Sequence, residues 1–244
     1  MSIIEVENLT RKFNSFTAVD HVNFKVGEGS IFGYIGLNGA GKTTTVKVLT
    51  TIIPPTEGAA TIGGNDVVKD PLNVRKMIGV VSEGEKAPKP DWTPYQYLLY
   101  FGTLHNLPEP EIKERAIALL KTFDLLEVAN KKIGELSNGM KKKVEICRAM
   151  LSYPQILFLD EPTKDLDIPT KREVWELLRN IAVEEKTTIF LCSHDIYEIN
   201  ELCEQICVIA KGRITFNGSM EDLRIGKDVG ELEKSVIKLL RGEP

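Results

Sequence analysis

The chain has 244 residues, of which 42% are hydrophobic and 27% charged, and its net charge of -4 corresponds to an isoelectric point near 5.6. This length and composition suit one good-sized core or two unequal lobes and exclude a disordered chain. The acidic balance argues against a general nucleic-acid binder, and no apolar run approaches the ~18 residues that a membrane-spanning helix needs.

The first third of the chain alternates short extended segments with turn signals. The first residues run into Glu5 and Glu7 instead of a basic start and an apolar stretch, so a secretory signal is disfavoured. Apolar alternation and short apolar runs predict strands at residues 3–7, 21–26 and 30–35.

A helix is predicted from Gly41 to just before Pro54, because the pair Pro54-Pro55 cannot continue it. Extended segments are expected again at residues 60–63 and 77–82.

Residues 84–153 then take on helical periodicity, which predicts a helical insert. Within it, the segment 109–123 has apolar residues on one stripe, namely Ile112, Ala116, Leu119, Leu120 and Phe123.

After the insert the chain returns to strand, helix and strand at residues 156–160, 169–183 and 187–192. This alternation predicts a parallel sheet covered by helices. The C-terminal residues are weakly patterned, although Ser219 and Asp222 resemble a capping box for a short helix.

The four cysteines lie in apolar contexts without CxxC spacing and are Cys147, Cys192, Cys203 and Cys207. We interpret them as reduced core residues of a cytosolic protein. Metal binding by Cys203 and Cys207 is the alternative.

A phosphate-binding motif of the form GxxxxGK[ST] follows the third predicted strand and opens the next helix. Its glycines allow backbone N–H groups to point inward, and the helix N-terminus adds a partial positive charge. Lys42 can then reach the terminal phosphates of a nucleotide, and the Thr43 hydroxyl can ligate Mg2+. The alternative is a tight turn without a ligand. The predicted nucleotide contacts of this segment are Gly36, Asn38, Gly39, Ala40, Gly41, Lys42, Thr43 and Thr44.

The apolar strand predicted at residues 156–160 ends in two acids, Asp160 and Glu161. The carboxyl end of a central parallel strand faces the ligand crevice, so Asp160 is expected near Mg2+ and Glu161 near the phosphate under attack. Glu161 can orient a water and accept its proton, which predicts hydrolysis rather than transfer to a second substrate. A plain strand exit is the alternative for the acid pair alone.

Two further motifs complete a pattern that resembles the ABC ATPase family over nearly the whole chain. Residues 136–140 read LSNGM, which is similar to the signature motif LSGGQ, and residues 193–195 read SHD after the next predicted strand. The resemblance implies an α/β fold: a P-loop NTPase (RecA-like) core with a mostly parallel sheet, an antiparallel β subdomain and a helical subdomain insert. It implies an ATP-binding domain over residues 1–220, containing the insert at about 84–153, and a C-terminal appendage over 221–244.

The signature segment also has a physical interpretation. Ser137 is a suitable N-cap and Gly139 leaves backbone N–H groups uncovered, so this helix start is a second potential anion site. A simple helix cap is the alternative. The resemblance implies that Ser137 and Gly139 contact the γ-phosphate of ATP held by a second ATP-binding subunit, so that two chains enclose two ATP molecules.

The resemblance assigns roles to single residues elsewhere. Phe13 matches the aromatic residue that stacks on adenine, with a core aromatic as the alternative. His194 matches the histidine that contacts the γ-phosphate and positions the attacking water, with a structural histidine as the alternative. Leu166 and Asp167 match the loop that crosses the dimer interface. The implied catalytic residues are Glu161, His194 and Lys42.

Three positions depart from the family pattern. Glu83 stands where a glutamine usually touches Mg2+ and couples the nucleotide to the membrane partner, and a carboxylate there either ligates Mg2+ more strongly or repels the γ-phosphate. Met140 replaces the signature glutamine, and Asp165 replaces a small residue of the interface loop. The implied Mg2+ ligands are Thr43, Glu83 and Asp160.

The signature variant, with methionine after the glycine and lysines following, resembles the exporter branch in which ATPase and membrane subunits are separate chains. The expected protein is an ATP-hydrolysing subunit, peripheral on the cytoplasmic face of the cell membrane. Its expected partners are a membrane permease and a second ATP-binding subunit, and no nucleic acid. A soluble ABC ATPase acting on a macromolecular assembly is the alternative. A P-loop kinase would leave the motifs at 136–140 and 193–195 unexplained.

Overall fold

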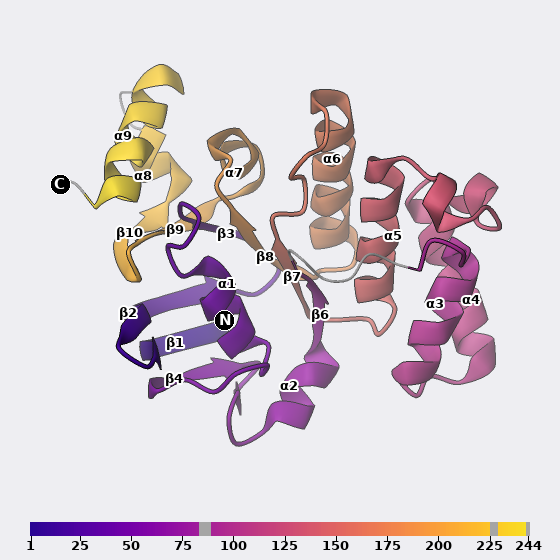
Figure 1. Cartoon of the computed structure of the whole chain (residues 1–244), viewed down its shortest axis with the longest axis horizontal. Helices are drawn as coiled ribbons and strands as arrows, with labels where there is room; N and C mark the ends of the chain where they lie inside the picture. The colour runs from indigo at the N-terminus through magenta and orange to yellow at the C-terminus, as the bar shows by residue number, and fades with distance from the viewer. Residues whose placement is uncertain (83–88, 225–228, 243–244) are drawn as a thin grey trace.

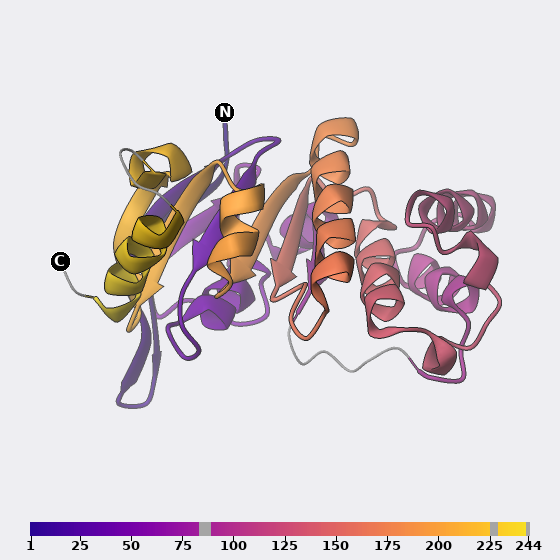
Figure 2. The ribbon, with the colours of Figure 1, turned by 90° about the horizontal axis from the view of Figure 1, so that it is seen from above.

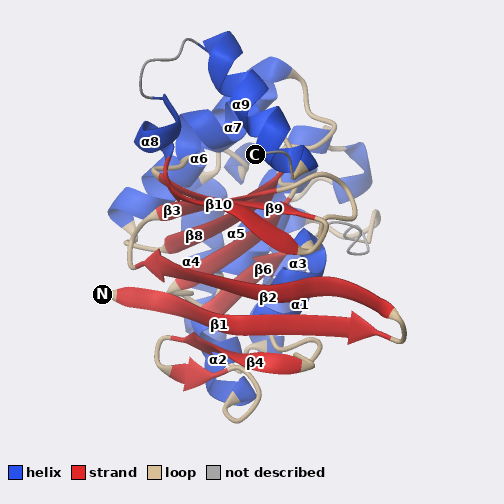
Figure 3. Cartoon of the chain, turned by 90° about the vertical axis from the view of Figure 1, so that its left-hand side faces the viewer, coloured by secondary structure: helices blue, strands red, loops and turns tan. Residues whose placement is uncertain are grey.

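The strands form two sheets in the computed structural model, which describes residues 1–82, 89–224 and 229–242. The larger sheet contains, in spatial order, β10 (Arg213–Ser219), β9 (Gln205–Ala210), β3 (Ile31–Ile35), β8 (Thr188–Ser193), β7 (Ile156–Asp160) and β6 (Ile78–Val81). The smaller, antiparallel sheet contains β2 (Phe16–Gly27), β1 (Ser2–Phe13), β4 (Glu57–Ile62) and β5 (Asn65–Asp66). Figure 3 shows strands of both sheets in red, with the smaller sheet below the larger one and blue helices above the larger one.

The larger sheet is parallel from β6 to β9, and β10 runs antiparallel to β9. Every residue of β3, β7 and β8 is buried. Such near-continuous apolar strands are expected where both faces of a parallel sheet are covered. Alternate side chains enter separate cores, so that Leu157 and Leu159 lie in one and Phe158 lies in the other.

The core between the two sheets is built around an aromatic cluster. The Phe190 ring on β8 has its centroid 5.2 Å from that of Phe158 and 5.5 Å from that of Phe32. It lies 5.5 Å from Tyr34 and 6.0 Å from Phe24 of β2. Because Phe24 belongs to the smaller sheet, these rings join the two sheets through the large apolar surface that aromatic residues bury.

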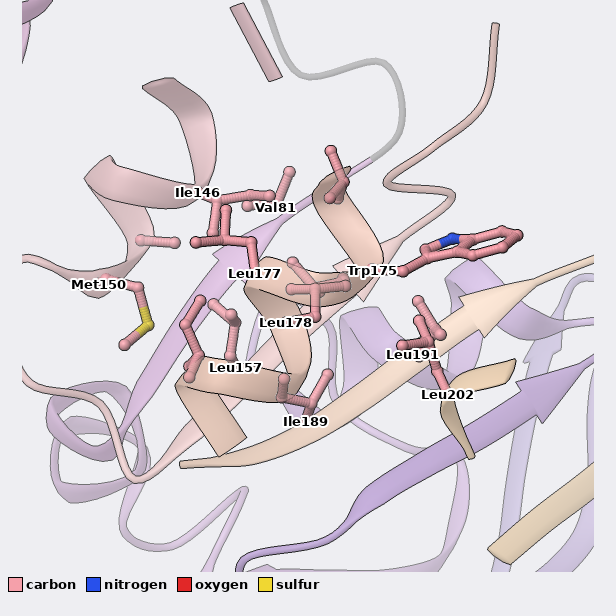
Figure 4. Packing of buried hydrophobic residues seen from close by; sticks show 14 of the residues in the cluster. Val81, Ile146, Met150, Leu157, Trp175, Leu177, Leu178, Ile189, Leu191 and Leu202 are labelled. Carbon is pink, nitrogen blue, oxygen red and sulfur yellow. The ribbon is translucent and has the colours of Figure 1, made fainter. Parts of the chain in front are cut away.

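The opposite face of the larger sheet is covered by helices. Figure 4 shows Leu157 and Leu191 of the sheet together with Leu177 and Leu178 of α6 (Ile168–Glu184) in one packed cluster. These four side chains are almost fully buried. Helix α6 therefore covers one face of β7 and β8 in the middle of the larger sheet.

A group of helices follows β6 and precedes β7, as the sequence predicts. It contains α3 (Pro94–Leu104), α4 (Glu109–Thr122), two 3-10 turns (Leu126–Val128 and Ile133–Glu135) and α5 (Asn138–Met150). Thr93 and Gln96 form a capping box at the start of α3. Figures 1 and 2 show this group at the right-hand end of the molecule, away from the smaller sheet.

The remaining helices are α1 (Lys42–Leu49), α2 (Pro71–Met77), α7 (Ile196–Leu202), α8 (Met220–Arg224) and α9 (Val229–Arg241). The capping box predicted before α8 is confirmed, because Ser219 Oγ accepts from the Asp222 backbone N–H at 3.0 Å and Asp222 Oδ2 accepts from the Ser219 N–H at 3.1 Å. Val236 and Leu240 of α9 are buried in the core that contains α6. No helix in the described ranges combines the length and apolarity needed to cross a bilayer.

The predicted fold class is confirmed, and the strand at 156–160 has the predicted bounds. The first two strands are longer than predicted, at 12 residues each, because register shifts between β1 and β2 interrupt the apolar alternation. The strands β9 and β10 were not predicted.

All four cysteines are free and buried. Burial raises the pKa of each thiol. Cys203 belongs to the core that contains α6 and Cys207 to the core between the sheets, so the two side chains point to opposite sides of the larger sheet.

Candidate functional site

The carboxyl end of β3 turns into α1 through the predicted phosphate loop. Gly39 and Gly41 have φ angles of 79° and 114°, in the left-handed region that favours glycine. A Cβ atom at Gly41 would lie 2.6 Å from the carbonyl oxygen of Ala18. One at Gly36 would lie 2.8 Å from the carbonyl oxygen of Ile209. A side chain at position 36 would therefore push the loop away from β9, and a side chain at position 41 would push it away from β2.

The loop borders a cavity of about 320 Å³. The cavity is lined by Phe16, Ala18, Leu37, Asn38, Gly39, Gly41, Lys42, Thr43 and Thr44. All of these except Phe16, Ala18 and Leu37 are among the predicted nucleotide contacts. The other two predicted contacts of this loop, Gly36 and Ala40, are buried.

Lys42 is held inside this loop. Its side chain is 6% exposed, and its Nζ atom donates a 2.7 Å hydrogen bond to the carbonyl oxygen of Gly36. The same Nζ lies 3.4 Å from Oε1 of Glu161. The ammonium group is thus fixed between the loop backbone and the predicted catalytic carboxylate.

Thr43 and Asp160 meet at the start of α1. The Thr43 hydroxyl donates a 2.8 Å hydrogen bond to Oδ2 of Asp160, and the Asp160 residue is 1% exposed. A hydroxyl and a carboxylate beside the phosphate loop fit Mg2+, which prefers a few hard oxygen ligands together with substrate phosphates. Glu83, the third ligand predicted from the sequence, lies outside the described residues.

Glu161 follows Asp160 and contacts His194. Its Oε2 atom lies 2.8 Å from Nδ1 of His194, and its carboxylate is 5% exposed whereas the imidazole is 45% exposed. Glu161 has a φ of 53°, an uncommon value for a residue other than glycine. This turn of the backbone at the strand end directs the two adjacent carboxylates to different partners.

The register of the sheet brings these groups together. Ile35 pairs with Ser193 and Asp160 pairs with Cys192 across neighbouring parallel strands. The three strands therefore end at the same edge, and the residues that follow them project into one crevice.

Ser137 caps α5 as predicted, with its Oγ accepting from the Met140 N–H at 3.2 Å. A Cβ atom at Gly139 would lie 2.3 Å from Cγ2 of Thr170, so glycine permits close packing against α6. Neither Ser137 nor Gly139 lines the cavity beside the loop. Figures 1 and 2 show α5 apart from α1, in the group of helices at the right.

Phe13 lies in the hairpin between β1 and β2, opposite Phe16. Its ring is partly exposed, and the Arg11 guanidinium lies over it at 4.6 Å from the ring centroid. Phe16 lines the cavity and Phe13 does not. Sequence reasoning missed Phe16, although an aromatic residue three positions from Phe13 in a short hairpin was a detectable signal.

The loop between β7 and α6 contains the predicted interface residues. Asp165 has a φ of 62°, in the left-handed region that aspartate tolerates better than most residues other than glycine. Asp167 caps α6, because its Oδ1 accepts from the Thr170 N–H at 3.0 Å. Leu166 is half-buried against the core that contains α6.

Comparison with known proteins gives a consistent picture. A family model described as ABC transporter matches residues 19–164. The chain is 34% identical to the ABC transporter ATP-binding protein NatA of Bacillus subtilis, over 98% of this chain and 99% of that protein. It is 36% identical to the Nod factor export ATP-binding protein I of Burkholderia thailandensis, over 94% of this chain and 76% of that protein.

Solved structures agree. The fold superimposes with a TM-score of 0.86 on CbiO1 of Clostridium perfringens, part of the ABC transporter complex cbiONQ, at 27% identity over 96% of this chain and 94% of that one. It superimposes with a TM-score of 0.79 on the dimeric post-hydrolysis state of the cassette MJ0796 bound to ADP and Pi, at 25% identity over 89% and 98% of the two chains.

The parallel sheet with its glycine-rich loop before α1 defines a P-loop NTPase. The chain belongs to the ABC transporter family, as an ATP-binding subunit of the ABC ATPase type. Membership of this family implies ATP hydrolysis.

Proposed function

We propose that this chain hydrolyses Mg-ATP to ADP and phosphate. In this proposal, a pair of ATP-binding subunits lies on the cytoplasmic face of the membrane and powers export through a separate membrane permease. The observation that carries the hydrolytic part is the position of Glu161. Its carboxylate lies between Lys42 Nζ, at 3.4 Å, and His194 Nδ1, at 2.8 Å. A base beside a phosphate-binding lysine is placed to act on a water at the γ-phosphate.

Each group has a distinct role in this proposal. The loop N–H groups and Lys42 bind the phosphates, while Thr43 and Asp160 would hold Mg2+, which would supply positive charge to neutralise the phosphates. Glu161 accepts a proton from the attacking water as the new oxygen–phosphorus bond forms and the bond to the β–γ bridging oxygen breaks. His194, which lies 2.8 Å from Glu161, contacts the γ-phosphate and positions the attacking water.

The proposed dimer follows from the position of the signature helix. Ser137 and Gly139 are absent from the cavity that contains Lys42. A second ATP-binding subunit, facing this one, would bring its own α5 N-terminus to the γ-phosphate and complete the site. The dimeric cassette MJ0796 among the structural neighbours supports this arrangement.

The export direction rests on two observations. The Nod factor export ATP-binding protein I is 36% identical to this chain. The LSNGM signature followed by lysines resembles the exporter branch with separate permease chains.

In the proposed organisation, residues 1–220 form the ATP-binding domain, residues 84–153 its helical insert, and residues 221–244 a C-terminal appendage.

Purification from membranes tests the transport part. The tagged chain, expressed with its neighbouring reading frames, is expected to co-purify with an integral membrane protein. Reconstitution of that complex in vesicles is expected to raise ATP turnover above that of the chain alone. Recovery only with ribosomal or other soluble assemblies, together with undiminished ATP turnover, would favour the alternative of a soluble ABC ATPase.

A further inference from the structure

Glu198 in α7 is a buried carboxylate outside the proposed catalytic machinery. It is 1% exposed. Its Oε1 atom accepts a 2.6 Å hydrogen bond from the Thr163 hydroxyl and a 3.0 Å hydrogen bond from Nε1 of Trp175. The Ser193 hydroxyl also interacts with this carboxylate, and the interaction lowers the pKa of the carboxyl group. Three donors from different parts of the chain thus converge on one side chain.

Two of these donors adjoin the proposed catalytic residues. Thr163 lies two positions after Glu161, in the loop that leaves β7, and it is 1% exposed. Ser193 is fully buried at the end of β8 and directly precedes His194. The Glu198 carboxylate therefore connects the backbone segment of Glu161 to that of His194.

The third donor connects Glu198 to α6, the helix that follows the loop of Asp165. Trp175 is 8% exposed, and Figure 4 shows it on the side of α6 opposite Met150, together with Leu191 and Leu202. Both Trp175 and Leu202 belong to the same buried cluster.

Two ion pairs flank this contact and continue it along both helices. Lys171 Nζ lies 2.6 Å from Oδ2 of Asp195, and Arg179 lies 2.9 Å from Oε2 of Glu201. The donors on α6 are spaced by four residues, at 171, 175 and 179, and the acceptors at the start of and along α7 by three, at 195, 198 and 201. Residues at such spacings share one helix face, so three contacts join α6 to α7.

Packing alone does not account for a glutamate at this place. A buried carboxylate is costly unless hydrogen bonds compensate, and an apolar side chain of similar size would pack at lower cost. Burial raises the pKa of the Glu198 carboxyl, and interactions with Ser193, Thr163 and Trp175 oppose that rise. Its hydrogen bonds are thus the property that distinguishes it from a leucine.

We propose that Glu198 is a positioning residue, which keeps His194 aligned with Glu161 through its contacts with the segments that carry them. The inference rests on the proposed roles of Glu161 and His194. Glu198 does not line the cavity beside the phosphate loop. The inferred role is therefore indirect and involves no contact between Glu198 and ATP.

The test compares Glu198→Leu with Glu198→Gln in the full-length ATP-binding subunit. Leucine removes the acceptor, whereas glutamine keeps one oxygen for Thr163 and Trp175. We expect Glu198→Leu to lower kcat roughly tenfold to hundredfold, since small misplacements of catalytic groups have effects of that order. The Kd for Mg-ATP is expected to stay within about threefold, because the phosphate loop is untouched, and Glu198→Gln is expected to retain kcat within about threefold.

Thr163→Val keeps the proposal testable if Glu198→Leu does not fold. Thr187→Val is its matched control, because Thr187 is also a buried threonine whose hydroxyl donates one hydrogen bond, to the carbonyl oxygen of Pro154 at the other end of β8. We expect Thr163→Val to lower kcat and Thr187→Val to leave it unchanged.

Three results would overturn the inference: wild-type kcat in a folded Glu198→Leu, equal losses in Glu198→Leu and Glu198→Gln, or equal effects of the two threonine variants. If Glu161→Gln is inactive while folded Glu198→Leu has wild-type kcat, only this inference fails. If Glu161→Gln has wild-type turnover, the proposed function itself fails.

Discussion

The Nδ1 atom of His194 lies 2.8 Å from Oε2 of Glu161, although the two residues are 33 positions apart in the chain. The contact forms because β7 and β8 are parallel neighbours in register and end at the same edge of the sheet. Glu161 is buried and His194 is partly exposed, so the imidazole is the accessible member of the pair. His194 is therefore the member of the pair that is open to contact from outside the buried strand end.

Replacement of His194 by alanine should slow hydrolysis without preventing binding. Positioned acid–base groups contribute about 10² to 10⁴ in rate, so we expect kcat to fall at least about a hundredfold while the Kd for Mg-ATP changes little. Steady-state kinetics and equilibrium nucleotide binding measure both quantities. His105→Ala, in the cap of α3, is the control and should behave as wild type. Equal kcat in the two variants would remove His194 from the mechanism.

Replacement of Lys42 by alanine should weaken nucleotide binding. A hydrogen bond to a charged group is worth about 1.5–3 kcal/mol, and each 1.4 kcal/mol changes affinity tenfold, so a loss of roughly tenfold to a hundredfold is expected. Lys47→Ala is the matched control, because Lys47 lies on the same helix and is exposed. Fluorescent-nucleotide titration distinguishes them. Unchanged affinity in Lys42→Ala would contradict the binding role of the loop.

The left-handed backbone of Asp165 predicts a stability series. Its φ of 62° is tolerated by glycine, asparagine and aspartate but disfavours a β-branched side chain. We expect Asp165→Val to lower the free energy of unfolding by about 1–2 kcal/mol, and Asp165→Asn and Asp165→Gly to stay within about 1 kcal/mol of wild type. Urea unfolding measures the series. A valine variant as stable as the glycine variant would show that this backbone conformation is not retained.

Glu198 should make stability depend on pH. Its carboxyl has an ordinary pKa of 4.5 that burial raises in the folded chain, so the folded state binds the proton more tightly than the unfolded state. The contribution of this group to the free energy of unfolding is therefore fully present at pH values below the unfolded-state pKa. It is lost as pH rises through the folded-state pKa. Glu198→Gln removes the effect. The stability of Glu198→Gln relative to wild type should accordingly increase with pH above 4.5 in urea unfolding series. A pH-independent difference would contradict the raised pKa.

The local part of the site could be predicted from the sequence. The loop around Lys42 and the acids at 160 and 161 are contiguous motifs with local sequence signals. Glycines mark the bend of the loop, and an apolar strand precedes the acids. The parallel order of strand, helix and strand then places both motifs at one sheet edge.

The rest depends on contacts between distant segments. Phe16 reaches the cavity only because the β1–β2 hairpin folds over the loop, and the twelve-residue strands contain register shifts that hide their period. Glu198 has partners at 163, 175 and 193, and no spacing in the sequence relates them. Tertiary hydrogen bonds of this kind have no local pattern to detect.

The most direct test of the proposed function is the rate of ATP hydrolysis by Glu161→Gln, measured beside nucleotide binding and oligomeric state. Glutamine preserves the shape of the side chain but cannot accept the proton, whereas Glu176→Gln alters an exposed glutamate of α6 and serves as control. We predict that Glu161→Gln binds Mg-ATP as wild type, accumulates as an ATP-bound dimer and loses at least about a hundredfold in turnover. Turnover within about tenfold of wild type in a variant that binds ATP normally would contradict the assignment of Glu161 as the base.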